Sequence, residues 1–96
     1  MKESKLEKNC RDLAEAMMWA VYKGFGRIGA SDKILLKDGR GFTAEIKTDV
    51  GIESELQKND AQYLKLRGVP RYVIRNLEDM KNALLTEQYK LDNNGK

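Results

Sequence analysis

A predicted β-hairpin over residues 32–48 constrains the fold of this 96-residue chain more than any other feature. The first arm, residues 32–37, is short and rich in branched apolar side chains, and Asp38 and Gly39 follow it. This dipeptide favours a hairpin turn because glycine tolerates positive φ. Residues 41–48 form the returning arm, so we expect two antiparallel strands joined by a tight turn.

Apolar and polar side chains alternate along the returning arm. Since successive side chains of a strand point to opposite faces, Glu45 and Lys47 share one face. The turn at 38–40 brings Asp32, at the start of the first arm, near the same end of the ladder. An aspartate, a glutamate and a lysine therefore converge. The other face of the arm is apolar and consists of Phe42, Ala44 and Ile46.

These three charged side chains fit a divalent metal site. Two neighbouring carboxylates repel each other unless a cation lies between them. Mg²⁺ takes oxygen ligands, commonly one or two carboxylates together with water and phosphate. With Lys47 as a second positive centre, the group suits hydrolysis of a phosphodiester by metal-bound water. A structural alternative stays open at this point, because a Glu-x-Lys pattern on the solvent face of a strand is common.

Two residue types are scarce enough to exclude whole classes of chemistry. The chain has no histidine, which excludes Ser-His and Cys-His nucleophiles and histidine metal sites. Its single cysteine, Cys10, excludes an intrachain disulfide and a zinc cluster. Cys10 is in phase with the apolar stripe of a predicted helix, so we expect it in the core. Catalysis would therefore depend on carboxylates, lysines, hydroxyls and a hard metal.

Composition indicates one globular domain over residues 1–96, with a core over about 6–88 and a loose tail at 91–96. The chain is 41% hydrophobic and 34% charged, which excludes a disordered class. Its net charge of +3 permits nucleic-acid binding without requiring it. There is no apolar run of membrane-spanning length and no apolar signal-peptide segment, so we expect a cytoplasmic protein with no membrane partner.

Apolar periodicity predicts a helix over residues 4–23. Its buried stripe consists of Leu6, Cys10, Leu13, Met17 and Val21. Residues 17–22 carry more apolar side chains than one helix face can hold. Either the core encloses this segment on more than one side or the extra apolar surface meets a second subunit, and we favour the second interpretation.

The second half of the chain reads as helix, strand, helix. A helix is predicted over 54–67, where Ser54 and Gln57 have capping-box spacing and Gly68 ends the helix. Gln57 could instead face a metal-bound water, and both interpretations stay open. A strand over 69–75 and a helix over 77–88 follow. The predicted fold class is mixed α/β, in the order α-β-β-α-β-α, with the last strand parallel to the returning hairpin arm.

The order and spacing of these residues resemble the virus-type replication-repair nuclease (VRR-NUC) domain of the PD-(D/E)XK nuclease superfamily. Residues 29–32, Gly-Ala-Ser-Asp, look like the family's Gly-x-Pro-Asp, with Ser31 in place of the usual proline. Residues 45–47 match its Glu-x-Lys, Gln57 matches a glutamine in the next helix, and Glu7 best matches an early helical glutamate. The resemblance covers residues 6–85 and implies a restriction-endonuclease-like core.

The resemblance also implies roles for the site residues. It implies metal ligation of Mg²⁺ or Mn²⁺ by Asp32, Glu45 and the carbonyl of Ile46. The implied catalytic residues are Asp32, Glu45, Lys47, Gln57 and Glu7, with Lys47 as the catalytic lysine, Gln57 as an organiser of water or of the metal site, and Glu7 as an outer helper.

Small standalone members of this family, typical of bacterial viruses, are similar to junction-resolving enzymes. The resemblance therefore implies a homodimeric Holliday-junction resolvase that cuts branched DNA, in the host bacterial cytoplasm if a phage encodes it. A flap or nicking nuclease and a non-catalytic DNA-binding module are the alternatives. Basic residues near the hairpin are candidate phosphate contacts. They are Lys23, Arg27, Lys33, Arg40 and Lys58, followed by Lys65 and Arg67.

Overall fold

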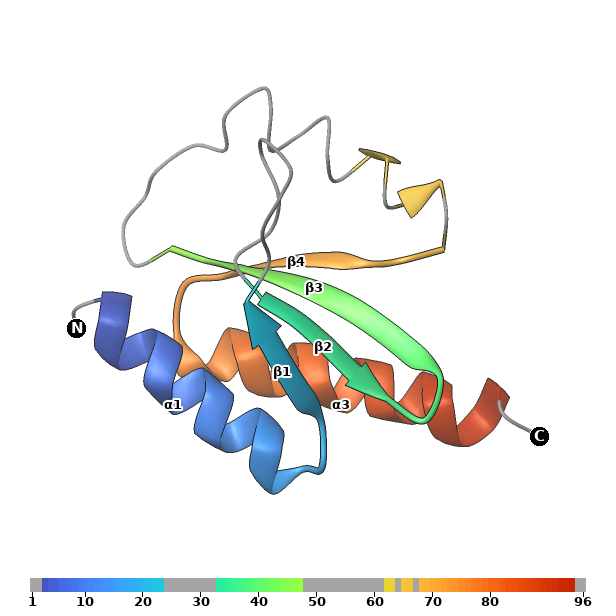
Figure 1. Ribbon diagram of the computed structural model, residues 1–96, viewed down its shortest axis with the longest axis horizontal. Coiled ribbons are helices and arrows are strands. Elements are labelled where there is room, and N and C mark those ends of the chain that lie inside the picture. Colours follow the sequence, from blue (N-terminus) through green and yellow to red (C-terminus); the bar gives the residue numbers. More distant parts are fainter. Residues whose placement is uncertain (1–2, 24–32, 48–61, 64, 67, 95–96) are drawn as a thin grey trace.

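The computed structural model describes residues 3–23, 33–47, 62–63, 65–66 and 68–94. Figure 1 shows a sheet with helices packed below it. The elements, in chain order, are α1 (Glu3–Ala16), β1 (Ala20–Lys23), β2 (Lys33–Lys37), β3 (Arg40–Ile46), β4 (Arg71–Ile74) and α3 (Leu77–Asn94).

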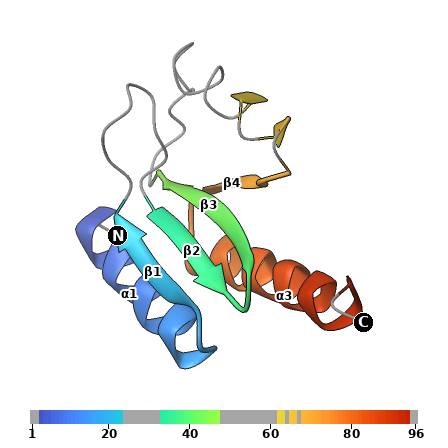
Figure 2. The same ribbon diagram turned by 45° about the vertical axis from the view of Figure 1, so that its right-hand side comes forward.

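The four described strands form one mixed sheet in the order β1-β2-β3-β4. Figure 2 shows β1 at one edge and β4 at the other. The predicted hairpin is confirmed, since β2 and β3 pair antiparallel with Leu35 opposite Phe42. Asp38 and Gly39 both have positive φ, 48° and 84°, as the twist of a two-residue hairpin turn requires. The predicted parallel pairing of β3 and β4 is also confirmed.

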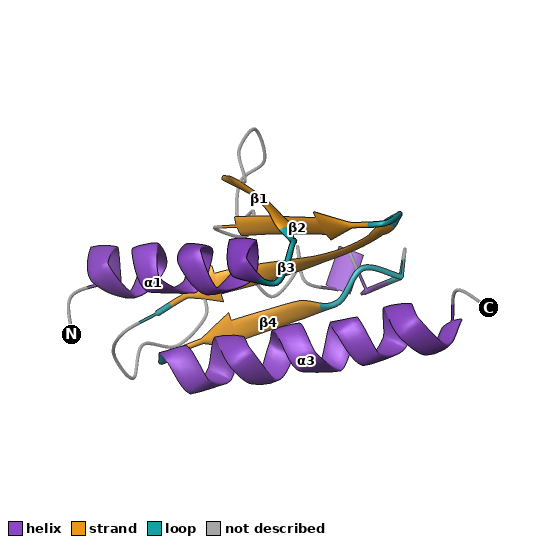
Figure 3. Cartoon of the chain, turned by 90° about the horizontal axis from the view of Figure 1, so that it is seen from below, coloured by secondary structure: helices purple, strands orange, loops and turns teal. Residues whose placement is uncertain are grey.

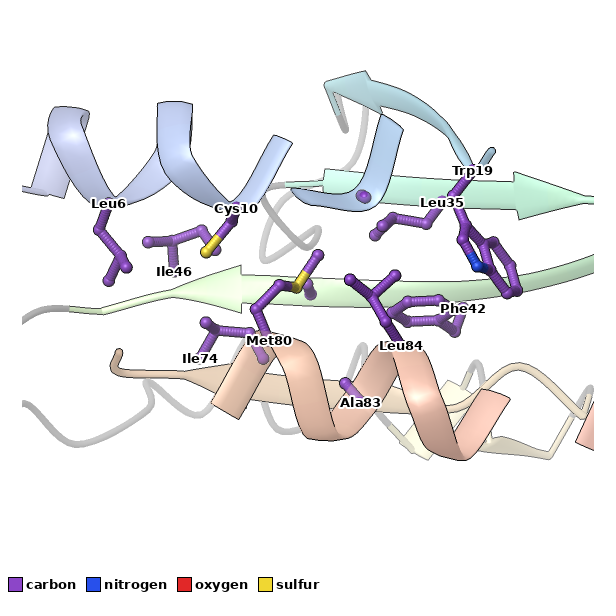
Figure 4. Packing of buried hydrophobic residues seen from close by; sticks show 12 residues of the cluster. Leu6, Cys10, Trp19, Leu35, Phe42, Ile46, Ile74, Met80, Ala83 and Leu84 are labelled. Atoms are coloured by element: carbon purple, nitrogen blue, oxygen red, sulfur yellow. The ribbon is translucent and has the colours of Figure 1, made fainter. Parts of the chain in front are cut away.

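Helices α1 and α3 cover the same face of the sheet (Figures 1 and 3). The alternation of apolar and polar side chains along β3 determines which face of the sheet is covered, because Phe42, Ala44 and Ile46 all point into the core. Figure 4 shows this packing. The buried apolar residues are Leu6, Cys10 and Ala14 of α1, Trp19, Leu35 of β2, Phe42, Ala44 and Ile46 of β3, Ile74 of β4, and Met80, Ala83 and Leu84 of α3. The predicted mixed α/β class is confirmed.

The prediction of a helix over 4–23 is wrong in its last turns, because the helix ends at Ala16. Two backbone hydrogen bonds close the end: Met18 N–H donates to Glu15 O and Trp19 N–H donates to Ala14 O, both at 3.0 Å. These are the bonds of a Schellman motif, and Met18 takes its left-handed position with φ 68°. The chain then turns back, and Trp19 enters the core against Phe42, with ring centroids 5.1 Å apart.

Residues 20–23 therefore form a strand that the sequence analysis missed. β1 pairs antiparallel with β2, with Val21 opposite Leu35. Val21 packs against the core, whereas Ala20 and Tyr22 are exposed, which is the alternation of a strand and not of a helix. The expected apolar surface over residues 17–22 is thus divided, because Trp19 is buried and Met18 is exposed.

The second half follows the predicted order where it is described. The predicted helix over 54–67 lies largely outside the described residues, but Gly68 has φ 78° and its N–H donates to Lys65 O, as at a helix end. Asn76 caps α3, since its Oδ1 accepts from the N–H of Asp79 at 2.8 Å.

The predicted end of the last helix at 88 and the loose tail from 91 are corrected, because α3 continues to Asn94. Gln88 Nε2 donates to Asp92 Oδ1 at 2.9 Å, a contact one turn apart that supports these last turns. No helix in the described part of the chain is long and apolar enough to cross a membrane.

The left-handed backbone of Met18 gives a first prediction. The side chain is 77% exposed and contributes little packing, so Met18→Gly removes a steric cost and should raise the free energy of unfolding by about 0.5–1 kcal/mol. Urea unfolding followed by the fluorescence of Trp19, the only tryptophan, measures the change. Ala16→Gly is the matched control, because Ala16 is exposed but helical and the same change should destabilise it. A loss of stability in Met18→Gly would contradict the assignment.

Candidate functional site

The face of the sheet opposite α1 and α3 carries Glu45 of β3 and Lys47, which follows β3. Thr43 and Glu45 alternate with the core residues and are themselves buried, and Lys47 follows in the same phase. Lys47 N–H donates to Ile74 O at 2.8 Å, which holds the backbone just beyond the strand. Between the two charged residues, the side chain of Ile46 is anchored in the core. Glu45 and Lys47 are therefore fixed on one face by the packing of the other.

Glu45 is a buried carboxylate between two cations. Its residue is only 4% exposed. Lys47 Nζ lies 3.8 Å from Glu45 Oε1, and Arg71 Nη2 lies 3.9 Å from Glu45 Oε2. Both distances exceed a hydrogen bond, so these contacts act through charge and not through a direct proton bridge. A buried carboxylate needs such compensation, since desolvation alone costs several kcal/mol.

The structure thus brings together two of the predicted site residues, Glu45 and Lys47. Asp32 and Gln57 lie outside the described residues. Lys33, which follows Asp32 in the chain, is opposite Ala44, the neighbour of Glu45. The role predicted for the carbonyl of Ile46 stays a prediction.

Glu7 lies on the helix-covered side of the sheet. Its Oε1 is 3.8 Å from Nζ of Lys33, whose side chain shares a face with Leu35 and the core. The contact links α1 to the first residue of β2. The carboxylate of Glu45 points to the opposite face.

Arg71 is a site residue that the sequence analysis missed. It opens β4 and is paired with Thr43, so both side chains lie on the Glu45 face. Its side chain is 4% exposed. The residue type gave no signal, since an arginine at the start of a strand is ordinary. Only the register of the parallel pair, set through residues far apart in sequence, brings it to Glu45.

The candidate phosphate contacts lie in different parts of the structure. Lys23 is exposed at the end of β1. Lys33 faces Glu7, and Arg40 Nε donates to Glu87 at 2.8 Å on the helix-covered side. Lys65 is exposed. The other three candidates, Arg27, Lys58 and Arg67, lie outside the described residues.

Glu87 is a second buried carboxylate, on the opposite side of the sheet. It is fully buried on α3, and its oxygens accept from Arg40 Nε at 2.8 Å, from the hydroxyl of Tyr72 at 2.5 Å and from Lys90 Nζ at 3.3 Å. Burial acts to raise the pKa of Glu87, but the three hydrogen bonds outweigh it and the pKa is lowered. The cluster ties the hairpin, β4 and α3 together and is structural.

The lone thiol has no nucleophilic role. Cys10 is buried in the core, and burial raises its pKa to about 11. The reactive thiolate is therefore scarce at neutral pH.

The donor set around Glu45 fits a hard divalent cation in its chemistry. A buried carboxylate oxygen is a ligand that Mg²⁺ or Mn²⁺ prefers. Within the described residues no three acids, cysteines or histidines gather at one point, so Glu45 would need ligands from elsewhere. The arrangement can bind a cation at Glu45 and present the ammonium of Lys47 to an anion beside it.

The fold is similar to a solved structure described as "VRR_NUC domain". The TM-score is 0.75 and the sequence identity 25%, and the match covers 91% of this chain and 96% of that chain. No protein-family model matches the sequence, and no curated protein is significantly similar to it.

The Glu87 cluster gives a prediction about acid stability. Because its folded-state pKa is lowered, Glu87 contributes stability above its ordinary value of 4.5, and this stability is lost as the pH falls through the folded-state pKa. Glu87→Gln should lower the free energy of unfolding by about 2 kcal/mol at pH 7. Below pH 4.5 the difference from the wild type should shrink. Urea unfolding across pH measures both, with the exposed Glu15→Gln as the control. A difference that does not decrease at all as the pH falls below 4.5 would contradict it.

Proposed function

We propose that this chain, whose fold is similar to that of a VRR_NUC domain, is a metal-dependent endonuclease of branched DNA. The observation that carries the proposal is the pair of Glu45 and Lys47 beside each other on the sheet face opposite α1 and α3. Burial of a carboxylate costs folding free energy, and buried ionisable groups beside a charged partner are frequent at functional sites.

We propose Mg²⁺ or Mn²⁺ as the cofactor, held by Glu45, Asp32 and the carbonyl of Ile46. Support for Asp32 comes from its neighbour, since Lys33 pairs with the residue preceding Glu45. When bound, the ion supplies an activated water and neutralises phosphate charge. Gln57 is proposed to orient that water. Glu7 contacts Lys33 on the helix-covered side of the sheet, so its proposed help is indirect, through the first residue of β2.

Lys47 would contact the scissile phosphate. Its side chain is 22% exposed, so the ammonium is accessible while its stem is held beside Glu45. An ammonium there opposes the negative charge that builds on the phosphoryl oxygens in the transition state. The hydrolysis breaks one phosphorus–oxygen bond of the DNA backbone as water adds to phosphorus.

We further propose that the enzyme is a homodimer that resolves Holliday junctions. Tyr22 and Leu36 are exposed apolar side chains on one face of β1 and β2, at 57% and 46%, and Met18 lies just before β1. A twofold pair of sites would suit a four-way junction, since symmetric cuts are needed on opposed strands. Lys23 is a proposed backbone contact, with Arg27 and Lys58.

The proposal predicts loss of cleavage when the site is altered. Glu45→Gln and Lys47→Ala should each lower the rate of junction cleavage by about 10³-fold or more, because a phosphodiester is inert without these groups. The measurement is cleavage of a labelled four-way junction with Mg²⁺ or Mn²⁺, and EDTA should abolish it. Lys81→Ala, an exposed lysine of α3, is the control and should cut normally. Wild-type rates in Lys47→Ala would overturn the proposal.

The dimer is tested separately. The mass in solution should be twice the 11.0 kDa of the chain, and Leu36→Glu should halve it and abolish paired cuts on opposed strands. Leu85→Glu is the matched control, since Leu85 is equally exposed but lies on α3. If the wild type is monomeric, or if it cuts flaps and nicks but leaves junctions intact, the resolvase assignment fails and a simpler DNA nuclease remains.

A further inference from the structure

We propose that Arg71 is a positioning residue that serves as a fixed counter-charge for Glu45 and opposes divalent cations at this carboxylate. The inference rests on the proposed function, since it assumes that Glu45 is a metal ligand. It adds a residue outside the predicted Asp, Glu, Lys and Gln set. Arg71 would thereby set how much metal the protein binds in the absence of DNA.

The first support is geometric. Arg71 is opposite Thr43 in the parallel pair, one step along β3 from the Glu45 position on the same face. Its Nη2 lies 3.9 Å from Glu45 Oε2, whereas Lys47 Nζ lies on the other oxygen, Oε1. Each carboxylate oxygen therefore has its own cation. At 3.8 and 3.9 Å, each cation is too far from its nearest oxygen of Glu45 for a hydrogen bond to that oxygen.

The second support is the difference between the two cations. The side chain of Arg71 is 4% exposed and that of Lys47 is 22% exposed. A lysine at that exposure can swing toward solvent on its flexible stem, but a buried guanidinium cannot leave without disturbing its surroundings. Arginine also stays protonated in proteins. Arg71 therefore keeps its positive charge, and the charge stays at a fixed position beside Glu45.

A cation fixed near the ligand oxygen affects a second cation directly. Like charges a few ångströms apart repel far more strongly in a buried site than in water. A divalent ion approaching Glu45 meets this repulsion, which lowers its affinity. The same cation compensates the negative charge of Glu45 and holds its carboxylate in place when no metal is bound.

The test is the affinity for Mn²⁺ alone, measured by calorimetry without DNA. Arg71→Gln should bind Mn²⁺ about fivefold tighter or more than the wild type. Arg75→Gln makes the same chemical change four residues along, in an exposed residue, and should leave the affinity near that of the wild type. Arg71→Lys keeps the charge and should not reach the affinity of Arg71→Gln.

Circular dichroism decides whether the variant is folded. If Arg71→Gln is unfolded in EDTA, Mn²⁺ should restore the folded spectrum, because the ion then supplies the missing charge beside Glu45. Failure to refold at saturating Mn²⁺ would overturn the inference.

The remaining outcomes separate this inference from the proposed function. Equal Mn²⁺ affinity in wild type, Arg71→Gln and Arg75→Gln overturns only the role of Arg71. The same holds if Arg71→Gln loses affinity for a labelled DNA duplex in EDTA without a change in Mn²⁺ affinity, since Arg71 is then a phosphate contact. If neither the wild type nor any variant binds Mn²⁺, the proposed function falls and the inference with it.

Discussion

The alternation of side chains along β3 is the constraint on which the rest of the structure depends. Phe42, Ala44 and Ile46 point into the core beneath α1 and α3, and this burial leaves no freedom in where Glu45 points. A slip of one residue would place the carboxylate among apolar side chains and expose three core residues together. The hydrophobic stabilisation of the fold therefore also fixes the position of the candidate site. No loop is needed to aim Glu45.

The two buried carboxylates, Glu45 and Glu87, have different surroundings. Glu87, on α3, accepts close hydrogen bonds from Arg40 of β3 and Tyr72 of β4, and these direct contacts compensate its charge. Glu45 has its two cations at 3.8 and 3.9 Å, on a face that neither described helix covers. The hydrogen bonds tie Glu87 into the fold, whereas Lys47 and Arg71 compensate the charge of Glu45 from a longer distance. The same residue type thus accepts close hydrogen bonds at one position and lies between two cations at the other.

Local patterns in the sequence predicted the hairpin, because turn chemistry and period-two alternation act within a few residues. They failed at residues 17–23, since the helix is ended by Met18 in a left-handed conformation that glycine usually takes. Apolar residues in this stretch fit a helical stripe as well as a strand next to a buried tryptophan. The sequence analysis missed Arg71 for a different reason. Its place beside Glu45 depends on the register between β3 and β4, which are joined through more than twenty residues and which no local pattern specifies.

The parallel partner strand adds what a hairpin cannot supply alone. From the described residues of β2, the face of Glu45 receives the side chain of Ile34, which carries no charge. β4 brings Arg71 to the same face and, through the carbonyl of Ile74, holds the backbone of Lys47. Since β4 is an edge strand of four residues, its own stability comes from β3 on one side and from α3 beneath it. The Glu87 cluster, which joins Tyr72 of β4 to α3, thereby supports the charged face from the opposite side of the sheet. Damage to that cluster should reach the site through the position of β4 and not through charge, because the sheet lies between the two carboxylates.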